Sequence, residues 1–177
     1  MLETLALLLP LALGGVLLVS GVAKLRGTDN ENTWELLLDR APRPLRALPA
    51  RPLSWAHVVA ELTVGVLLLV GHGVRVPVLV VATCLFGAFT AVAWYSTRAK
   101  DPVPCSCFGR GATTLKPRHV ARNAVLTLMG ASALALNAGS TPALAPGQVM
   151  LAVAVAVIVT ALVWAFDDIA YLLNPRA

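Results

Sequence analysis

The chain has 177 residues, of which 58% are hydrophobic and only 13% are charged. A soluble domain carries about a quarter of its residues as Asp, Glu, Lys and Arg, so this composition argues against a water-soluble protein. The formal net charge of +5 comes from basic residues gathered in two loops. That distribution is typical of a membrane-topology signal and not of a nucleic-acid-binding surface. We therefore expect a multi-pass protein of the cell (plasma) membrane that binds no nucleic acid.

The first apolar run, residues 5–25, predicts a membrane-spanning helix, because about 20 apolar residues cross the hydrocarbon core. The run lacks the alternation of a barrel strand, which leaves the helix as the spanning structure. A signal peptide is the alternative, but no basic residue precedes the run and the run exceeds a typical signal core. The helix ends in "SGVAKL". We expect Lys24, in its last turn, to extend its ammonium toward the membrane surface.

The segment 26–53 connects the first two spans. Its part "NENTWELLLDR" predicts a short helix lying at the membrane interface, with a plain connector as the alternative. The following "APRPLRALPARP" is rich in Pro and Arg and predicts an extended segment.

Further spans are predicted at residues 54–72, 76–97, 118–137 and 148–171, which gives an all-α integral membrane protein with five helices. Thr114 and Pro117 mark the start of the fourth helix, since Thr caps helices and Pro suits a first turn. Cys84 falls in the middle of the third helix, where a cysteine usually serves as a small packing residue.

Ionisable side chains within membrane helices are costly, so each needs an explanation. His57 and Glu61 are four residues apart on one face of the second span, and Arg122 and Asn123 begin the fourth. The chain order brings these residues, Lys24 and the loop after the third span to one membrane side. Glu61 and Arg122 lie at similar depths of about 10 Å, which predicts an ion pair between them. The pair either holds the second helix to the fourth or has a direct chemical role. His119 is expected to be a solvated interfacial residue.

The loop "DPVPCSCFGRG" holds Cys105 and Cys107, separated by one residue. A disulfide between them would close a small strained ring that is easily reduced, and nearby Arg110 and Lys116 favour the reactive thiolate. Redox exchange is therefore the leading interpretation. The alternatives are a metal site, which needs more ligands than one such pair, lipid modification, and a structural loop without chemistry.

Four motifs in order, "SGVAKL", "AEL" with Glu61, "CSCFG" and "ARN", resemble the MauE family of methylamine utilisation proteins, across about three-quarters of the chain. The first motif is also similar to DoxX-like membrane proteins. The resemblance implies a four-helix membrane domain at 1–137, to which residues 138–177 add a C-terminal transmembrane helix. It also implies a fold similar to the bundles of membrane thiol oxidoreductases.

The same resemblance implies a role in the maturation of an exported, disulfide-rich client, of the methylamine dehydrogenase small-subunit type, together with a thioredoxin-like protein. Cys105 and Cys107 then form the redox pair, and Phe108 and Gly109 shape their turn. Lys24, His57, Glu61, Arg122 and Asn123 form the polar core beneath them. The chain lacks the second cysteine pair of quinone-linked oxidases, and its sequence identifies no quinone site.

Eleven Lys and Arg residues in the loops after the first and third spans face a single Arg75 on the opposite side. The positive-inside rule therefore places the cysteine loop in the cytoplasm, whereas disulfides form outside it. Three interpretations stay open. The charge distribution does not report the true topology, or the cysteine pair takes electrons from cytoplasmic thioredoxin and passes them outward, or the cysteines only stabilise the loop. A non-enzymatic membrane assembly or transport factor and a heavy-metal carrier are the alternative functions.

Overall fold

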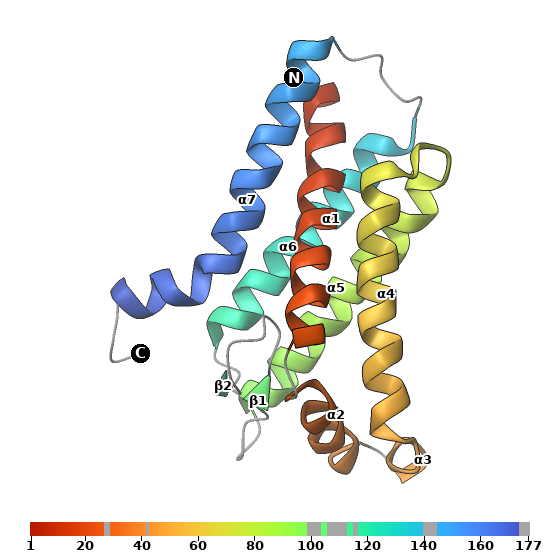
Figure 1. The fold of residues 1–177 in the computed structure, drawn as a ribbon, viewed down its shortest axis with the longest axis vertical. Helices are drawn as coiled ribbons and strands as arrows, with labels where there is room; N and C mark the ends of the chain where they lie inside the picture. The colour runs from red at the N-terminus through yellow and green to blue at the C-terminus, as the bar shows by residue number, and fades with distance from the viewer. Residues whose placement is uncertain are drawn as a thin grey trace.

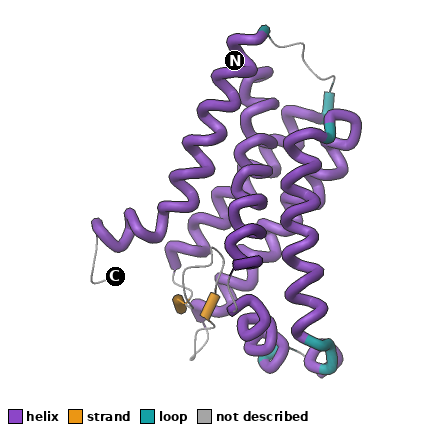
Figure 2. The backbone as a smooth tube through the Cα atoms, viewed as in Figure 1, coloured by secondary structure: helices purple, strands orange, loops and turns teal. Residues whose placement is uncertain are grey.

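The structure is a computed structural model that describes residues 1–26, 29–41, 43–98, 104–105, 113–114, 117–139 and 145–173. Apart from one pair of two-residue strands, every described element is helical, which confirms the all-α class (Figure 2). In chain order the elements are α1 (Leu2–Arg26), α2 (Asp29–Asp39), α3 (Arg43–Arg46), α4 (Ala50–Val70), the 3-10 turn η1 (His72–Val74), α5 (Arg75–Arg98), β1 (Pro104–Cys105), β2 (Thr113–Thr114), α6 (Pro117–Asn137) and α7 (Pro146–Leu173).

Helix α1 is the centre of the bundle and packs against α4, α6 and α7, while α5 packs against α6 (Figure 1). The apolar core lies among α1, α4, α5 and α6, where side chains such as Leu17, Leu68, Leu79 and Phe86 are buried. We call the end formed by α2, α3 and the adjoining ends of α1, α4, α5 and α6 the polar end of the bundle. The strands β1 and β2 lie at this end as well (Figure 1).

Within the described residues, four helical segments are long and apolar enough to cross a membrane: Leu2–Arg26, Ala50–Val70, Arg75–Arg98 and Pro146–Phe166. The chain is accordingly a multi-pass membrane protein. The fourth predicted span, at 118–137, is confirmed as helix α6, but it is not among these four segments. Its first two turns carry Arg118, His119 and Arg122, which lower its apolar character, so its crossing of the bilayer stays a prediction.

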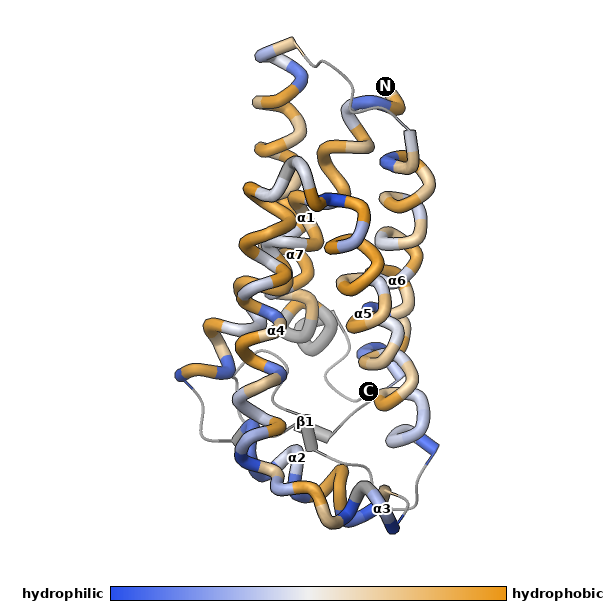
Figure 3. The backbone as a smooth tube through the Cα atoms, turned by 90° about the vertical axis from the view of Figure 1, so that its right-hand side faces the viewer, coloured by the Kyte–Doolittle hydropathy of each residue, from blue (hydrophilic) through white to orange (hydrophobic). Residues whose placement is uncertain are grey.

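Hydrophobic residues follow the long helices, whereas hydrophilic residues gather around α2 and α3 (Figure 3). Exposed aromatic side chains stand near this end on two helices: Trp55 near the start of α4, and Trp94 and Tyr95 near the end of α5, all at least 50% exposed. The Arg98 guanidinium lies 3.9 Å from the centroid of the Trp94 ring. Trp and Tyr are enriched at membrane–water interfaces, which places the interface at this level.

The connector between α1 and α4 confirms one prediction and corrects another. The short helix predicted from "NENTWELLLDR" is α2, and it packs on α4. The Pro- and Arg-rich stretch, predicted to be extended, instead holds α3 and the first turn of α4. Pro44 and Pro52 fall in first turns, where backbone N–H groups have no intrahelical acceptor and a missing donor costs nothing.

The prediction that Cys84 packs inside the protein is wrong. Its side chain is exposed on α5. The buried face of α5 includes Val78, Leu79, Ala82 and Phe86, and Cys84 lies off this face. In a bilayer an outward cysteine faces lipid, which accepts an apolar side chain as readily as a core does.

Helices α1 and α4 approach each other closely at Gly14 and Gly65. A Cβ atom added to Gly14 would lie 3.0 Å from the backbone oxygen of Gly65 and 3.1 Å from the Cβ of Leu68. These glycines therefore allow the two backbones to meet, as small residues do at membrane helix interfaces. By contrast, a Cβ on Gly87 of α5 would meet only Thr127, at 3.9 Å.

The change Gly14→Ala should lower the free energy of unfolding by about 1–3 kcal/mol, because the added methyl group overpacks the contact between α1 and α4. The matched change Gly87→Ala should be neutral or stabilising by about 0.5–1 kcal/mol, because alanine favours a helix and meets no crowding. Thermal melting in detergent measures both. Equal effects of the two changes would contradict the close approach.

Candidate binding pocket at the polar end

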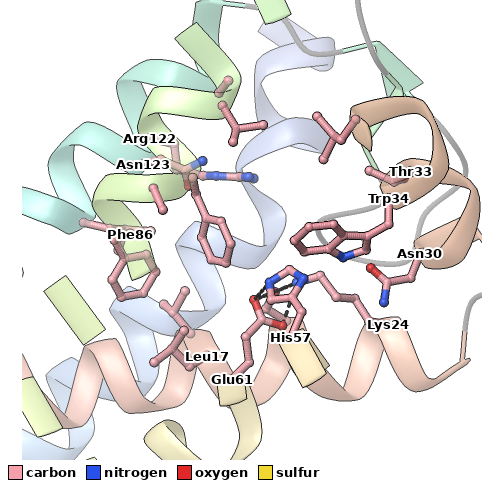
Figure 4. A pocket seen from close by; sticks show the side chains of 18 residues that line it. Leu17, Lys24, Asn30, Thr33, Trp34, His57, Glu61, Phe86, Arg122 and Asn123 are labelled. Atoms are coloured by element: carbon pink, nitrogen blue, oxygen red, sulfur yellow. Dashed lines mark hydrogen bonds and ion pairs between the residues drawn. The ribbon is translucent and has the colours of Figure 1, made fainter. Parts of the chain in front are cut away.

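A pocket of about 160 Å³ lies inside the polar end of the bundle, and its walls come from α1, α2, α4, α5 and α6 (Figure 4). The five residues that the sequence predicted as a polar core all line this pocket: Lys24, His57, Glu61, Arg122 and Asn123. The structure thus brings together side chains from three helices that are up to 99 positions apart in the chain. The rest of the surface of the pocket is mostly apolar.

An ion pair between Lys24 and Glu61, with hydrogen bonds to Ser20, forms one wall of the pocket. The Lys24 ammonium donates to both carboxylate oxygens of Glu61, at 2.7 and 2.6 Å, and to the Ser20 hydroxyl at 2.7 Å. Ser20 in turn donates to Glu61 Oε1 at 3.1 Å. The Lys24 side chain is 5% exposed and that of Glu61 is 0% exposed. All three ammonium donors are therefore used, and the two charges compensate each other away from water.

This pairing corrects two predictions. Lys24 does not reach the membrane surface, because its ammonium is buried against Glu61. The ion pair that the structure gives Glu61 is with Lys24, where the sequence predicted Arg122. The cause is the tight packing of α1 on α4: Gly21 lies so close to Leu62 that an added Cβ would be 2.8 Å from its Cδ2. Arg122 lines the same pocket from α6 and is itself buried.

His57 stands beside the ion pair and between two aromatic rings. Its Nε2 atom is 3.4 Å from Glu61 Oε1, a distance that suits an ion pair with a protonated imidazole but does not form a hydrogen bond here. The Trp34 ring meets the imidazole edge-on at a centroid distance of 5.7 Å, and the Phe89 ring lies 5.1 Å away. Both ring nitrogens are buried and have no hydrogen-bond partner among the described residues.

Sequence reasoning missed the contribution of α2 and α5 to this pocket. Trp34 and three other α2 residues cover the pocket, and Phe86 and Phe89 of α5 form an apolar wall (Figure 4). The Asn30 amide donates to the backbone oxygen of Ser54 at 3.2 Å and so ties α2 to α4. The signal available in the sequence was Trp34 within an otherwise polar and leucine-rich helix.

His119 is buried, with 4% of the residue exposed, so its predicted solvated position is wrong. It begins a buried stripe on α6 that continues through Arg122, Asn123, Leu126 and Gly130. This spacing of three and four residues is that of one helix face. The face packs into the bundle, and His119 is buried with it.

The predicted redox loop is only partly within the described residues. The backbone of Cys105 lies in β1, where Cys105 is paired with Thr113 of the antiparallel strand β2. Strand β1 contacts α2, the helix that covers the pocket. Cys107, Phe108 and Gly109 lie outside the described residues. Within the described part of the chain, no group of three or more His, Cys, Asp and Glu side chains is arranged to hold a metal ion.

Comparison with known protein families matches residues 2–138 to the family model described as methylamine utilisation protein MauE. The matched region holds all the helices that line the pocket and ends before α7. Searches of curated proteins and of solved structures found no match.

Removal of either partner of the ion pair should leave an uncompensated group inside the bundle. We expect Glu61→Gln and Lys24→Met each to lower the free energy of unfolding by about 3–5 kcal/mol, and the double change to cost less than the sum of the two. Melting of the four proteins in detergent completes the cycle. The control Glu3→Gln changes the same chemical group at an exposed site on α1 and should be nearly neutral. Additive losses would contradict the ion pair.

Proposed function

The chain belongs to the MauE family of methylamine utilisation proteins, and we propose that it supports the maturation of an exported, disulfide-rich partner in the plasma membrane. In this proposal Cys105 and Cys107 form the reactive thiol pair, and a thioredoxin-like protein is their redox partner. The residues 1–137 form the working membrane domain, and α7 is an addition to it.

The position of β1 is the observation that carries the proposal. The strand holds the backbone of Cys105 and contacts α2, and α2 covers the pocket that contains Lys24, His57 and Glu61. The described start of the cysteine loop therefore contacts the helix that covers the buried ionisable residues singled out by the sequence. Residues that are costly inside a membrane and lie together are candidates for a functional site.

The chemistry of such a pair is thiol–disulfide exchange. A thiolate of the client attacks the Cys105–Cys107 disulfide, the small ring opens, and a mixed disulfide forms as the old S–S bond breaks. The second client thiolate then attacks the mixed disulfide. The client gains a disulfide, and Cys105 and Cys107 receive the two electrons and bind two protons. The disulfide of the thioredoxin-like partner restores the pair by the same exchange in reverse.

Positive charge at this end of the bundle supports the thiolate that the proposed chemistry needs. Helix α6 begins at Pro117, and its N-terminus carries partial positive charge at the polar end of the bundle. Arg98 ends α5 on the same side. Positive charge lowers the cost of a thiolate and so raises its reactive fraction.

A second candidate function is that of a non-enzymatic assembly or transport factor. The closed Lys24–Glu61 ion pair with His57 beside it favours this candidate, because paired charges inside a membrane domain often mark a transport or proton path. The two candidates differ in what they require of the cysteines. The redox role needs both thiols, whereas an assembly factor tolerates Ser at both positions.

Thiol labelling of intact cells tests the proposal. In the Cys84→Ser variant, a membrane-impermeant maleimide should label the chain only after reduction, because the pair is oxidised at rest and faces outward. The matched control, Cys84→Ser with Cys105→Ser and Cys107→Ser, has no thiol left and should not be labelled. Labelling only after lysis, without reductant, would place reduced thiols in the cytoplasm and contradict the outward-facing redox pair.

A further inference from the structure

We propose that the pocket at the polar end binds a neutral molecule with a single planar ring and one oxygen substituent, which enters sideways from the lipid bilayer. The inference concerns the pocket alone. It stands whether or not Cys105 and Cys107 exchange electrons.

The exposure of the lining residues suggests where a guest would enter. Among the residues that line the pocket, Ala88 and Val92 of α5 are exposed. They lie within two turns of Trp94 and Tyr95, the exposed aromatic residues that mark the membrane interface. The mouth therefore opens at the edge of the hydrocarbon layer, below α2. A molecule dissolved in the bilayer reaches it without passing through water.

The size and lining of the pocket select one flat ring. An apolar cavity of about 150 Å³ accepts a benzene-sized molecule, and this pocket measures about 160 Å³. Trp34, Phe86 and Phe89 contribute aromatic rings to its walls. Rings pack against one another in edge-to-face and offset arrangements, so these walls suit a planar guest better than a flexible chain.

The polar wall decides against a charged guest. Lys24 and Glu61 compensate each other, and all three ammonium donors of Lys24 are used. Arg122 also lines the pocket and is already engaged in an interaction. A cationic guest would lie beside Lys24 and Arg122, and an anionic guest would have to compete with the partners that these two groups already have; both are costly in a low-dielectric site. A neutral guest leaves the ion pair intact.

The position of His57 indicates that the bound ring carries one oxygen substituent. The Nε2 atom of His57 lies 3.4 Å from Glu61 Oε1 without forming a hydrogen bond, and its Nδ1 atom is buried with no hydrogen-bond partner among the described residues. A buried polar group without a partner is costly. A neutral imidazole offers one donor and one acceptor. A hydroxyl or carbonyl oxygen on the rim of a bound ring satisfies one of them, while the ring itself lies in the pocket beside the imidazole.

A matched pair of probes tests this inference. The full chain carrying Cys84→Ser, Cys105→Ser and Cys107→Ser is placed in lipid nanodiscs, which removes thiol chemistry from the result. It is titrated with p-cresol and with p-xylene, which differ by a hydroxyl in place of a methyl group. Tryptophan emission is the readout, because Trp34 lines the pocket, and nanodiscs without protein give the partition of each probe into lipid. After this correction p-cresol should bind about tenfold more tightly, the value of one hydrogen bond.

Variants assign the effect to named residues. His57→Phe should remove the preference for p-cresol and leave p-xylene binding within about twofold, because the ring shape is kept and the nitrogens are lost. Retained p-xylene binding also reports that the pocket is folded. Trp34→Phe should abolish most of the emission change. Ala88→Trp should block the mouth, whereas Ala91→Trp, at an exposed neighbour that does not line the pocket, should not.

Three results would overturn the inference: equal affinity for the two probes, a p-cresol preference that survives His57→Phe, or displacement of both probes by a linear alkane. The last would identify an acyl-chain groove. If His57→Phe does not fold, the ratio of the two affinities in the chain with His57 decides the question. Failure of the maleimide experiment leaves these results unaffected, because the cysteines are absent from the protein that is titrated.

Discussion

The buried ion pair between Lys24 and Glu61 is the constraint on which the polar end of the bundle depends. Both side chains are buried, so each needs the other as its counter-ion. The pair fixes the last turn of α1 against the middle of α4, and close contacts at Gly14 and Gly21 make that approach possible. Because the charges compensate each other, an otherwise apolar pocket can exist beside them at the edge of the membrane.

Helix α2 converts this corner of the bundle into a pocket. Its residue Trp34 covers His57, and its amide at Asn30 is held by the backbone of α4. The same helix contacts β1, the strand that holds the backbone of Cys105. A single short element therefore adjoins both the buried ionisable residues and the start of the cysteine loop. Movement of α2 would displace a wall of the pocket and a contact of β1 together. The proposed thiol chemistry and the proposed ring site therefore share one structural element.

The residues that bear the family motifs were identifiable from sequence, but their contacts were not. Glu61, Arg122 and Lys24 stood out because charges are rare in membrane helices, and chain order alone placed them at one end. Depth in the membrane then suggested the pair Glu61–Arg122, but depth does not show which way each side chain faces around its helix axis. Because α1 packs on α4, the ion pair of Glu61 forms with Lys24 instead. Similarly, the exposed Cys84 and the buried His119 depend on which helix face meets a neighbour.

Sequence patterns were enough to predict the all-α membrane class, the positions of the long helices within a few residues, and the family. These follow from local properties: apolar length, turn residues and ordered motifs. The partner of Glu61, the place of Trp34 over His57 and the pocket became visible only in the folded chain. Those features depend on helix rotation and on close approach at glycines, and both are set by contacts between residues far apart in the chain.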